Sequence, residues 1–228
     1  SMAFDAEGRL WIGTRNGLAS YDGYTFRCYF HHTADDTSLP HNFVLEVFVD
    51  SRNCVWVCTD GGLCRYNRAT DAFERIDLPE WRINHVTETH DGAIICSGNR
   101  LYRLDAGGTE FRHLPRARES HPLGMAVSPD NRLYVTTSAG MSYFDRQMKS
   151  CSEPDIDFYP QGIYDLDGTS PVIFDSTGKM WYDLNGYGVA CYDPKSGRTK
   201  SYGPDVLTNT TVREITEDHQ GRIWVGTE

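Results

Sequence analysis

The sequence predicts an all-β protein, a β-propeller of four-stranded blades, from two observations. First, one phrase recurs six times in complete or worn form: an Asp, a short turn, an apolar residue and then an anchor that is usually aromatic. Second, helical periodicity is absent, and the chain has few of the Lys and Ala residues that fill surface helices. The anchors follow one another every 39 to 47 residues, about the length of one blade, at Trp11, Trp56, Ile95, Tyr134, Trp181 and Trp224. A β-sandwich would also show short alternating strands, but it gives no reason for a phrase of near-constant spacing.

Each period divides into four short strands in the same order. In the opening period the anchor strand ends at the turn Arg15–Gly17, the kind of tight hairpin in which Gly or Asn takes a positive φ. A second short strand ends at Tyr21–Asp22, an outer strand follows over 25–29, and a longer polar connection leads to an apolar inner strand over 44–49. The same order returns later, with turns at 60–62, 138–140 and 185–186, an outer strand at 73–76 and an inner strand at 212–215.

Counted this way, residues 1–228 form a single, partial propeller domain of about five blades plus part of a sixth. The segment Arg222–Thr227 duplicates Arg9–Thr14 rather than supplying what the first blade lacks. We therefore expect a fragment of a longer propeller, and the alternative is that the last strands complete the first blade in a ring.

Composition excludes several classes of partner and site. The formal net charge is −10, from 22 Lys and Arg against 32 Asp and Glu, which disfavours direct contact with nucleic acid or an anionic membrane. No apolar run approaches the roughly 18 residues of a membrane span. The seven Cys form no C-x-x-C pair and no recurring spacing with His, so we expect no metal site and no cofactor. Cys58 and Cys64 flank a turn and would either face one another or be two small buried side chains; we expect the latter.

The phrase Gly8–Asp22 resembles the two-component regulator propeller repeat, whose core reads Gly-x-Leu-Trp-Ile-Gly-Thr-x-x-Gly-Leu. Residues 54–67 and 221–227 echo it, whereas the blades around Ile95 and Tyr134 have lost the Trp and the Gly-Thr pair. The resemblance implies the periplasmic sensor region of a hybrid two-component protein, in which a membrane-crossing helix leads to a histidine kinase, a receiver and often a DNA-binding module. It further implies a response to glycan fragments that switches on polysaccharide-utilisation genes. The kinase, receiver and DNA-binding parts are absent from this chain, so we expect no enzyme activity and no catalytic residue in it.

The tryptophans fall into two groups. Trp11, Trp56, Trp181 and Trp224 share one register, so we expect all four in the core between blades. Trp81 is out of register, in a polar connection between two blades and next to Arg82. We interpret this pair as a candidate ligand site at which a sugar ring stacks, and the alternative is a local plug over the core.

Further candidates lie in the connections that lead into inner strands. In a propeller these connections share a face with the hairpins between the two middle strands. His41, His85 and His121 each precede an inner strand, where they could bind sugar hydroxyls, hold a metal or simply cap strand ends; capping is the first expectation.

Arginines and tyrosines complete the candidate set. Arg116 and Arg118 belong to a run of arginines that would suit uronic or sulfated sugars, or else balance nearby carboxylates. Tyr159 lies in the long interruption 151–169, and Tyr187 lies beside the same face.

Three functions compete on this evidence. The leading one is a ligand-sensing module for an oligosaccharide or other small ligand, in a parent protein that could be a homodimer. The second is a propeller lyase or hydrolase that acts on a carbohydrate. The third is a scaffold that binds protein, including a second copy of itself.

Overall fold

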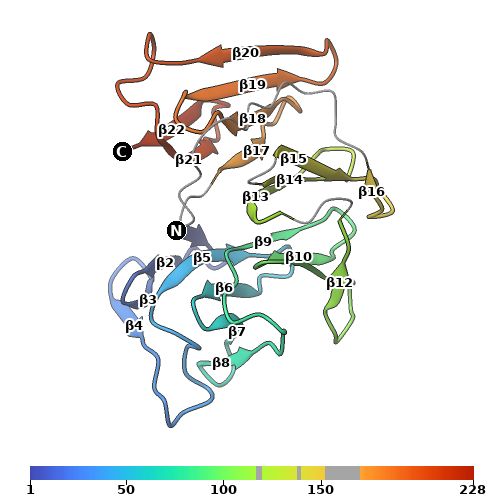
Figure 1. Cartoon of the computed structure of the whole chain (residues 1–228). Helices are drawn as coiled ribbons and strands as arrows, with labels where there is room; N and C mark the ends of the chain where they lie inside the picture. Colours follow the sequence, from blue (N-terminus) through green and yellow to red (C-terminus); the bar gives the residue numbers. More distant parts are fainter. Residues whose placement is uncertain (117–119, 138–139, 152–169) are drawn as a thin grey trace. The chain divides into compact units, whose positions relative to one another are not determined.

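The computed structural model describes residues 1–116, 120–137, 140–151 and 170–228. In these residues the chain forms five four-stranded antiparallel sheets and one two-stranded sheet (Figure 1). In every four-stranded sheet the strands lie side by side in chain order. The all-β class and the blade-like sheets are confirmed, and no helix in the described part of the chain is long and apolar enough to span a membrane.

Contacts divide the chain into two compact units, Ser1–His113 and Leu114–Glu228, which we call unit 1 and unit 2. The single-domain organisation stays a prediction. Unit 1 contains the first, second and third sheets. The last strand of the third sheet extends one residue past the end of unit 1. The strands of these three sheets are β1 (Met2–Phe4), β2 (Leu10–Thr14), β3 (Gly17–Tyr21), β4 (Phe26–Tyr29), β5 (Val44–Val49), β6 (Val55–Thr59), β7 (Gly62–Asn67), β8 (Ala72–Arg75), β9 (His85–Glu88), β10 (Ile94–Ser97), β11 (Leu101–Leu104) and β12 (Arg112–Leu114).

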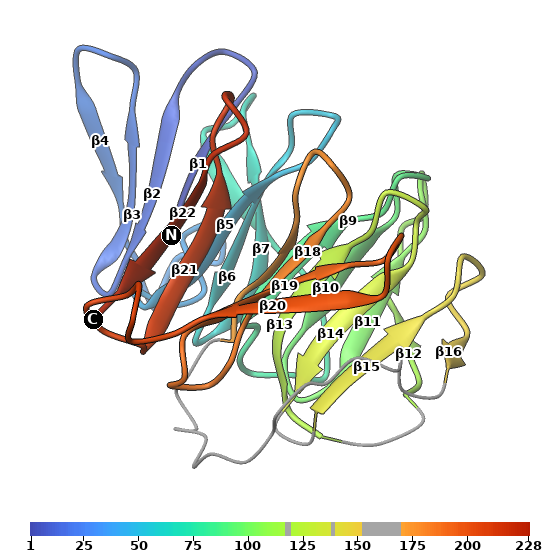
Figure 2. The same ribbon diagram turned by 90° about the horizontal axis from the view of Figure 1, so that it is seen from above.

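Unit 2 contains the fourth, fifth and sixth sheets (Figure 2). The sixth sheet has two strands. The strands of unit 2 are β13 (Pro122–Val127), β14 (Leu133–Thr137), β15 (Gly140–Phe144), β16 (Ser150–Cys151), β17 (Val172–Phe174), β18 (Met180–Asp183), β19 (Val189–Asp193), β20 (Arg198–Tyr202), β21 (Val212–Glu217) and β22 (Ile223–Thr227).

The Asp of the repeated phrase joins the first turn of a sheet to its anchor tryptophan. Asp5 Oδ1 accepts hydrogen bonds from the backbone N–H groups of Glu7 (3.1 Å) and Arg9 (2.9 Å). Its Oδ2 accepts the indole N–H of Trp11 at 2.9 Å and also contacts Arg68 Nη2 at 3.0 Å. Burial acts to raise the pKa of Asp5, but the bonds from Trp11, Arg9 and Arg68 outweigh it, and the pKa is lowered. The same indole bond is made in three other sheets, by Trp56 to Asp50, Trp181 to Asp175 and Trp224 to Asp218.

In the two repeats that have lost the anchor Trp, the Asp that would accept its indole N–H is replaced as well. Where the anchor is Ile95, the Asp position holds Thr89, and where it is Tyr134, the position holds Ser128. The hydroxyl oxygen keeps the turn bond of the Asp: Thr89 Oγ1 accepts the N–H of Ala93 at 3.1 Å and Ser128 Oγ accepts that of Arg132 at 3.0 Å. A second carboxylate oxygen is needed only where an indole N–H must be satisfied.

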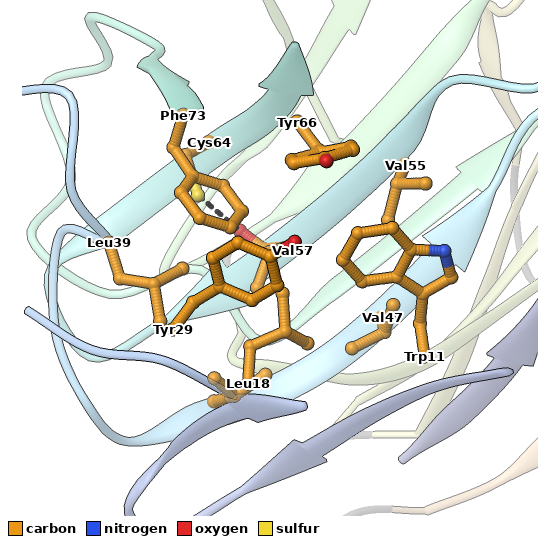
Figure 3. Packing of buried hydrophobic residues seen from close by; sticks show 11 residues of the cluster. Trp11, Leu18, Tyr29, Leu39, Val47, Val55, Val57, Cys64, Tyr66 and Phe73 are labelled. Atoms are coloured by element: carbon orange, nitrogen blue, oxygen red, sulfur yellow. Dashed lines mark hydrogen bonds between the residues drawn. The ribbon is translucent and has the colours of Figure 1, made fainter. Parts of the chain in front are cut away.

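The hydrophobic core of unit 1 lies between adjacent sheets. Trp11, Leu18 and Tyr29 from the first sheet pack on Val47, Val57, Tyr66 and Phe73 from the second (Figure 3). The ring centroids of Trp11 and Tyr66 are 4.7 Å apart. Such packing removes the largest apolar side chains from water, which is the main favourable term in folding.

The expectation that all four in-register tryptophans are core is wrong for one of them. Trp11 and Trp56 are buried and Trp181 is half-buried, but Trp224 is 56% exposed. Trp224 lies on the two-stranded sixth sheet, where the guanidinium of Arg222 lies 5.5 Å from the centroid of its ring but no further sheet of the described residues packs on it as the second sheet packs on Trp11.

The cysteines agree with their interpretation as small apolar side chains. Cys58 pairs across the hairpin with Leu63 and Cys64 with Val57, so the two thiols do not face one another. Both are buried and free, and burial raises the pKa of each thiol well above its ordinary value.

Candidate functional site

Two kinds of loop meet at one end of the sheets in unit 1. The hairpins inside β2–β3, β6–β7 and β10–β11 alternate with the connections that lead into β5 and β9, and backbone hydrogen bonds join each loop to the next. We call these loops, residues 14–17, 40–43, 59–62, 79–84 and 97–101, the loop face of unit 1. The joining bonds run from Gly17 N–H to the Asn42 carbonyl (2.7 Å), Asp60 N–H to Phe43 (3.1 Å), Ile83 N–H to Thr59 (3.2 Å) and Asn84 N–H to Ser97 (2.7 Å).

Trp81 stands on this face with 67% of its surface exposed. The residues around it are fixed. Glu80 accepts hydrogen bonds from the Asn99 side chain at 3.1 Å and the Tyr102 hydroxyl at 3.3 Å, and Ile83 is fully buried. Burial, followed by the Glu80 carboxylate, raises the pKa of Tyr102, which keeps its hydroxyl a donor. An exposed indole on an anchored backbone offers a flat apolar surface whose ordering cost is largely met before a ligand arrives.

Arg82 points its guanidinium across the face to the neighbouring hairpin. Its Nε lies 2.9 Å from Asn84 Oδ1 and 3.3 Å from Asp60 Oδ1. Both side chains of the ion pair are about a quarter exposed, with 26% of Arg82 and 22% of Asp60 accessible. The loop face of unit 1 therefore combines hydrogen-bond donors and acceptors next to Trp81 without a large excess of either charge.

His41 caps the start of an inner strand. Its Nδ1 accepts the backbone N–H of Phe43 at 3.0 Å, and the guanidinium of Arg15 lies 5.7 Å from the centroid of the Phe43 ring. Gly61 is required here, because a Cβ at that position would lie 2.6 Å from the carbonyl oxygen of Pro40. This close approach brings the second hairpin against the segment that carries His41.

The other two predicted histidines have different surroundings. His85 Nδ1 lies 3.4 Å from Glu46 Oε2, which also accepts the N–H of Val86 at 2.9 Å, so His85 belongs to the seam between the second and third sheets. His121 is exposed just before β13 in unit 2. Within the described ranges no group of three or more His, Cys, Asp and Glu side chains could hold a metal ion.

The remaining predicted residues fall in or next to unit 2. Arg116 is half-buried, Tyr187 is 65% exposed in the β18–β19 hairpin, and Arg118 and Tyr159 lie outside the described residues. One arginine of the predicted run, Arg103, is paired within unit 1. Arg103 points to the opposite end of the third sheet from the loop face, where it pairs with Asp91 at 3.0 Å and Asp105 at 2.6 Å.

Sequence reasoning missed Asp60, Glu80 and Asn84. Asp60 stands in the predicted turn before Gly61–Gly62, and Glu80 in the polar connection before Trp81. Their roles depend on contacts between different loops, for which the spacing of the repeat carries no signal. The one available hint was that both Glu80 and Asn84 lie within four residues of the out-of-register Trp81.

Comparisons with known proteins agree with the repeat. Residues 206–228 match the model of the two-component regulator propeller family. A 35-residue stretch is 49% identical to Histidine kinase P4 of Formosa agariphila, covering 15% of this chain and 3% of that protein.

Solved structures share the fold over nearly the whole chain. The extracellular domain assigned to a hybrid two-component system of B. thetaiotaomicron superposes with a TM-score of 0.79 and 19% identity, over 100% of this chain and 32% of that one. The virginiamycin B lyase of Staphylococcus aureus gives a TM-score of 0.76 and 16% identity, over 98% of this chain and 75% of that one. The chain thus spans about a third of the extracellular domain that it resembles. It has the β-propeller fold of such extracellular domains and carries the two-component regulator propeller repeat.

Proposed function

We propose that this chain is an extracytoplasmic ligand-sensing segment of a hybrid two-component signalling protein and that it responds to glycan fragments. In the parent protein, ligand binding would control a phosphorelay and the transcription of polysaccharide-utilisation genes, from a position in the periplasm. The segment itself carries no catalysis. The observation that carries the proposal is Trp81, an exposed indole on an anchored loop beside polar groups that can reach sugar hydroxyls.

The loop face of unit 1 suits a sugar ring for three reasons. The faces of pyranose rings are apolar and pack on flat aromatic side chains such as Trp81. Sugar hydroxyls both donate and accept hydrogen bonds, and Asp60, Asn84 and Arg82 offer both kinds of partner on the same loop face as Trp81. His41 adds a polar group on the same loops, and His85 lies directly after the loop 79–84, at the seam between the second and third sheets.

Five further predicted residues stay candidates: His121, Arg116 and Tyr187, which belong to unit 2, and Arg118 and Tyr159, which lie outside the described residues. Arg116 and Arg118 would select carboxylate or sulfate groups on an anionic glycan.

A thermal-shift screen of the chain against neutral, uronic and sulfated oligosaccharides tests the proposed function. A ligand at about a hundred times its Kd should stabilise the folded state by roughly 2.7 kcal/mol, which moves the melting temperature visibly. Chemical turnover of the bound oligosaccharide would contradict the sensor assignment and favour a lyase or hydrolase.

Replacing Trp81 with alanine should weaken binding of that oligosaccharide about 30-fold, because truncating a central aromatic anchor costs about 2 kcal/mol. Isothermal titration calorimetry measures the change. Trp224→Ala is the matched control, since it also removes an exposed indole but from a different sheet, and it should leave Kd unchanged. Equal losses in both variants would show that the indole of Trp81 has no special part in binding.

A further inference from the structure

Asp183 differs from the residues at the equivalent position of the other five sheets. It lies two residues after the anchor Trp181, at a place where the other sheets have Gly13, Cys58, Ser97, Thr136 and Gly226. Side chains at this place point toward the inner strand of the following sheet. A Cβ at Gly13 would lie 2.5 Å from Val44 Cγ1, and Thr136 Oγ1 donates to the carbonyl of Ser170 at 2.8 Å. Small and uncharged groups fit there, so a carboxyl group at the same place needs an explanation.

The carboxyl group of Asp183 is buried and only partly satisfied. The residue is 5% exposed, and its Oδ1 has no hydrogen-bond partner among the described residues. Burial raises the pKa of Asp183 to about 6, against the smaller opposing effects of the Asn185 and Gly186 backbone amides and of Arg213. A buried charge that lacks full pairing is costly, whereas the neutral acid is tolerated.

A charged group of the sixth sheet acts on Asp183: the positive charge of Arg213 tends to lower the pKa of its carboxyl group. Arg213 occupies the bulge of β21, where the register shifts between Val212 and Glu214. Its side chain is 47% exposed and is ion-paired with Glu228. The backbone N–H of Asp183 donates to the carbonyl of Pro171, one residue before β17, at 3.1 Å, and Asp183 lies opposite the apolar Val189 of β19. Neither Pro171 nor Val189 carries a charge. Ionised Asp183 must therefore compete with Glu228 for Arg213 or remain unpaired.

We propose that the protonation state of Asp183 controls how firmly the sixth sheet, β21–β22, is held against the fifth. The seam between them is small and apolar, with Val189, Val212 and Ile215 at its centre. Neutral Asp183 leaves this seam intact, and charged Asp183 places an incompletely paired anion at its edge. This effect of Asp183 is independent of the proposed glycan site, which lies on unit 1.

The direction of the pH dependence follows from the linkage between proton binding by Asp183 and opening of the seam. The group binds its proton more tightly when the seam is closed than when it is open and solvated, because its pKa is raised from 3.8 to about 6. The stabilisation by the proton is present at low pH and is lost as pH rises through about 6. Between pH 5.0 and 7.5 the equilibrium constant for opening β21–β22 should rise about tenfold.

Hydrogen exchange of the β21–β22 amides at pH 5.0 and 7.5, corrected for intrinsic rates, measures that constant in the intact chain. Wild type should show the tenfold change, and Asp183→Asn, a neutral isostere, should show none. Asp205→Asn, an exposed carboxyl group on the β20–β21 connection, should behave as wild type. If Asp183→Asn does not fold, carbon-13 titration of the Asp183 carboxyl group in wild type should give a midpoint near 6. A pH-independent constant in wild type, an unchanged slope in Asp183→Asn, or a midpoint near 4 would overturn the proposal.

Discussion

Truncation of Trp56 to alanine should lower the free energy of unfolding by about 3–5 kcal/mol, the cost of removing a large aromatic side chain from a packed core. Trp56 is 1% exposed in a cluster with Ile83 and Ile94, and the ring of Phe111 meets it edge-on at 6.1 Å. The truncation leaves a cavity and also removes the indole N–H that Asp50 accepts at 3.0 Å. The side chain of Asp50 is fully buried, so the lost bond adds to the cost.

Urea unfolding followed by circular dichroism measures the effect. Trp224→Ala is again the control, because that ring is 56% exposed and its removal should cost less than about 1 kcal/mol. Similar losses for the two variants would contradict the packing described for the anchor tryptophans.

Exchange of Asp5 for serine should cost about 3 kcal/mol in the wild-type background, because it leaves the buried indole N–H of Trp11 and the guanidinium of Arg68 without their shared carboxylate oxygen. The fourth sheet shows the condition under which serine is acceptable. There Ser128 holds the turn and the anchor is Tyr134, which has no indole N–H.

A double-mutant cycle tests this dependence. Asp5→Ser should cost about 1–2 kcal/mol less when it is combined with Trp11→Tyr than when it is made alone. Urea unfolding of the four proteins provides the coupling energy. Strictly additive losses would mean that the turn and the anchor do not depend on one another.

The repeat made most of the fold predictable. The phrase and its spacing located every anchor strand, because each blade repeats the same solution to closing a turn and burying an aromatic side chain. Trp224 is the exception, since its register is that of the buried anchors but burial also needs a neighbouring sheet to cover the ring. The repeat spacing predicts the strands of each sheet, but it does not predict which neighbouring sheet buries a given side chain.

The candidate site was less predictable for a related reason. Trp81 stood out because it departs from the register, but the contacts of Glu80 with Asn99 and of Arg82 with Asp60 join separate loops and leave no trace in the spacing of the repeat. Asp183 also stands out in the sequence, because the equivalent positions of the other sheets hold small, uncharged residues. Its burial, and the lack of a hydrogen-bond partner for its Oδ1 among the described residues, depend on the surrounding structure and leave no trace in the sequence.

The central claim is that an oligosaccharide binds on the loop face of unit 1, and the indole N–H signals of the five tryptophans test it most directly. In a nitrogen-15 NMR titration with an oligosaccharide that raises the melting temperature, the Trp81 signal, assigned with Trp81→Phe, should shift saturably. The exposed Trp224 serves as the internal reference and should not move. A stabilising oligosaccharide that leaves the Trp81 signal in place would contradict the account and locate its binding elsewhere on the chain.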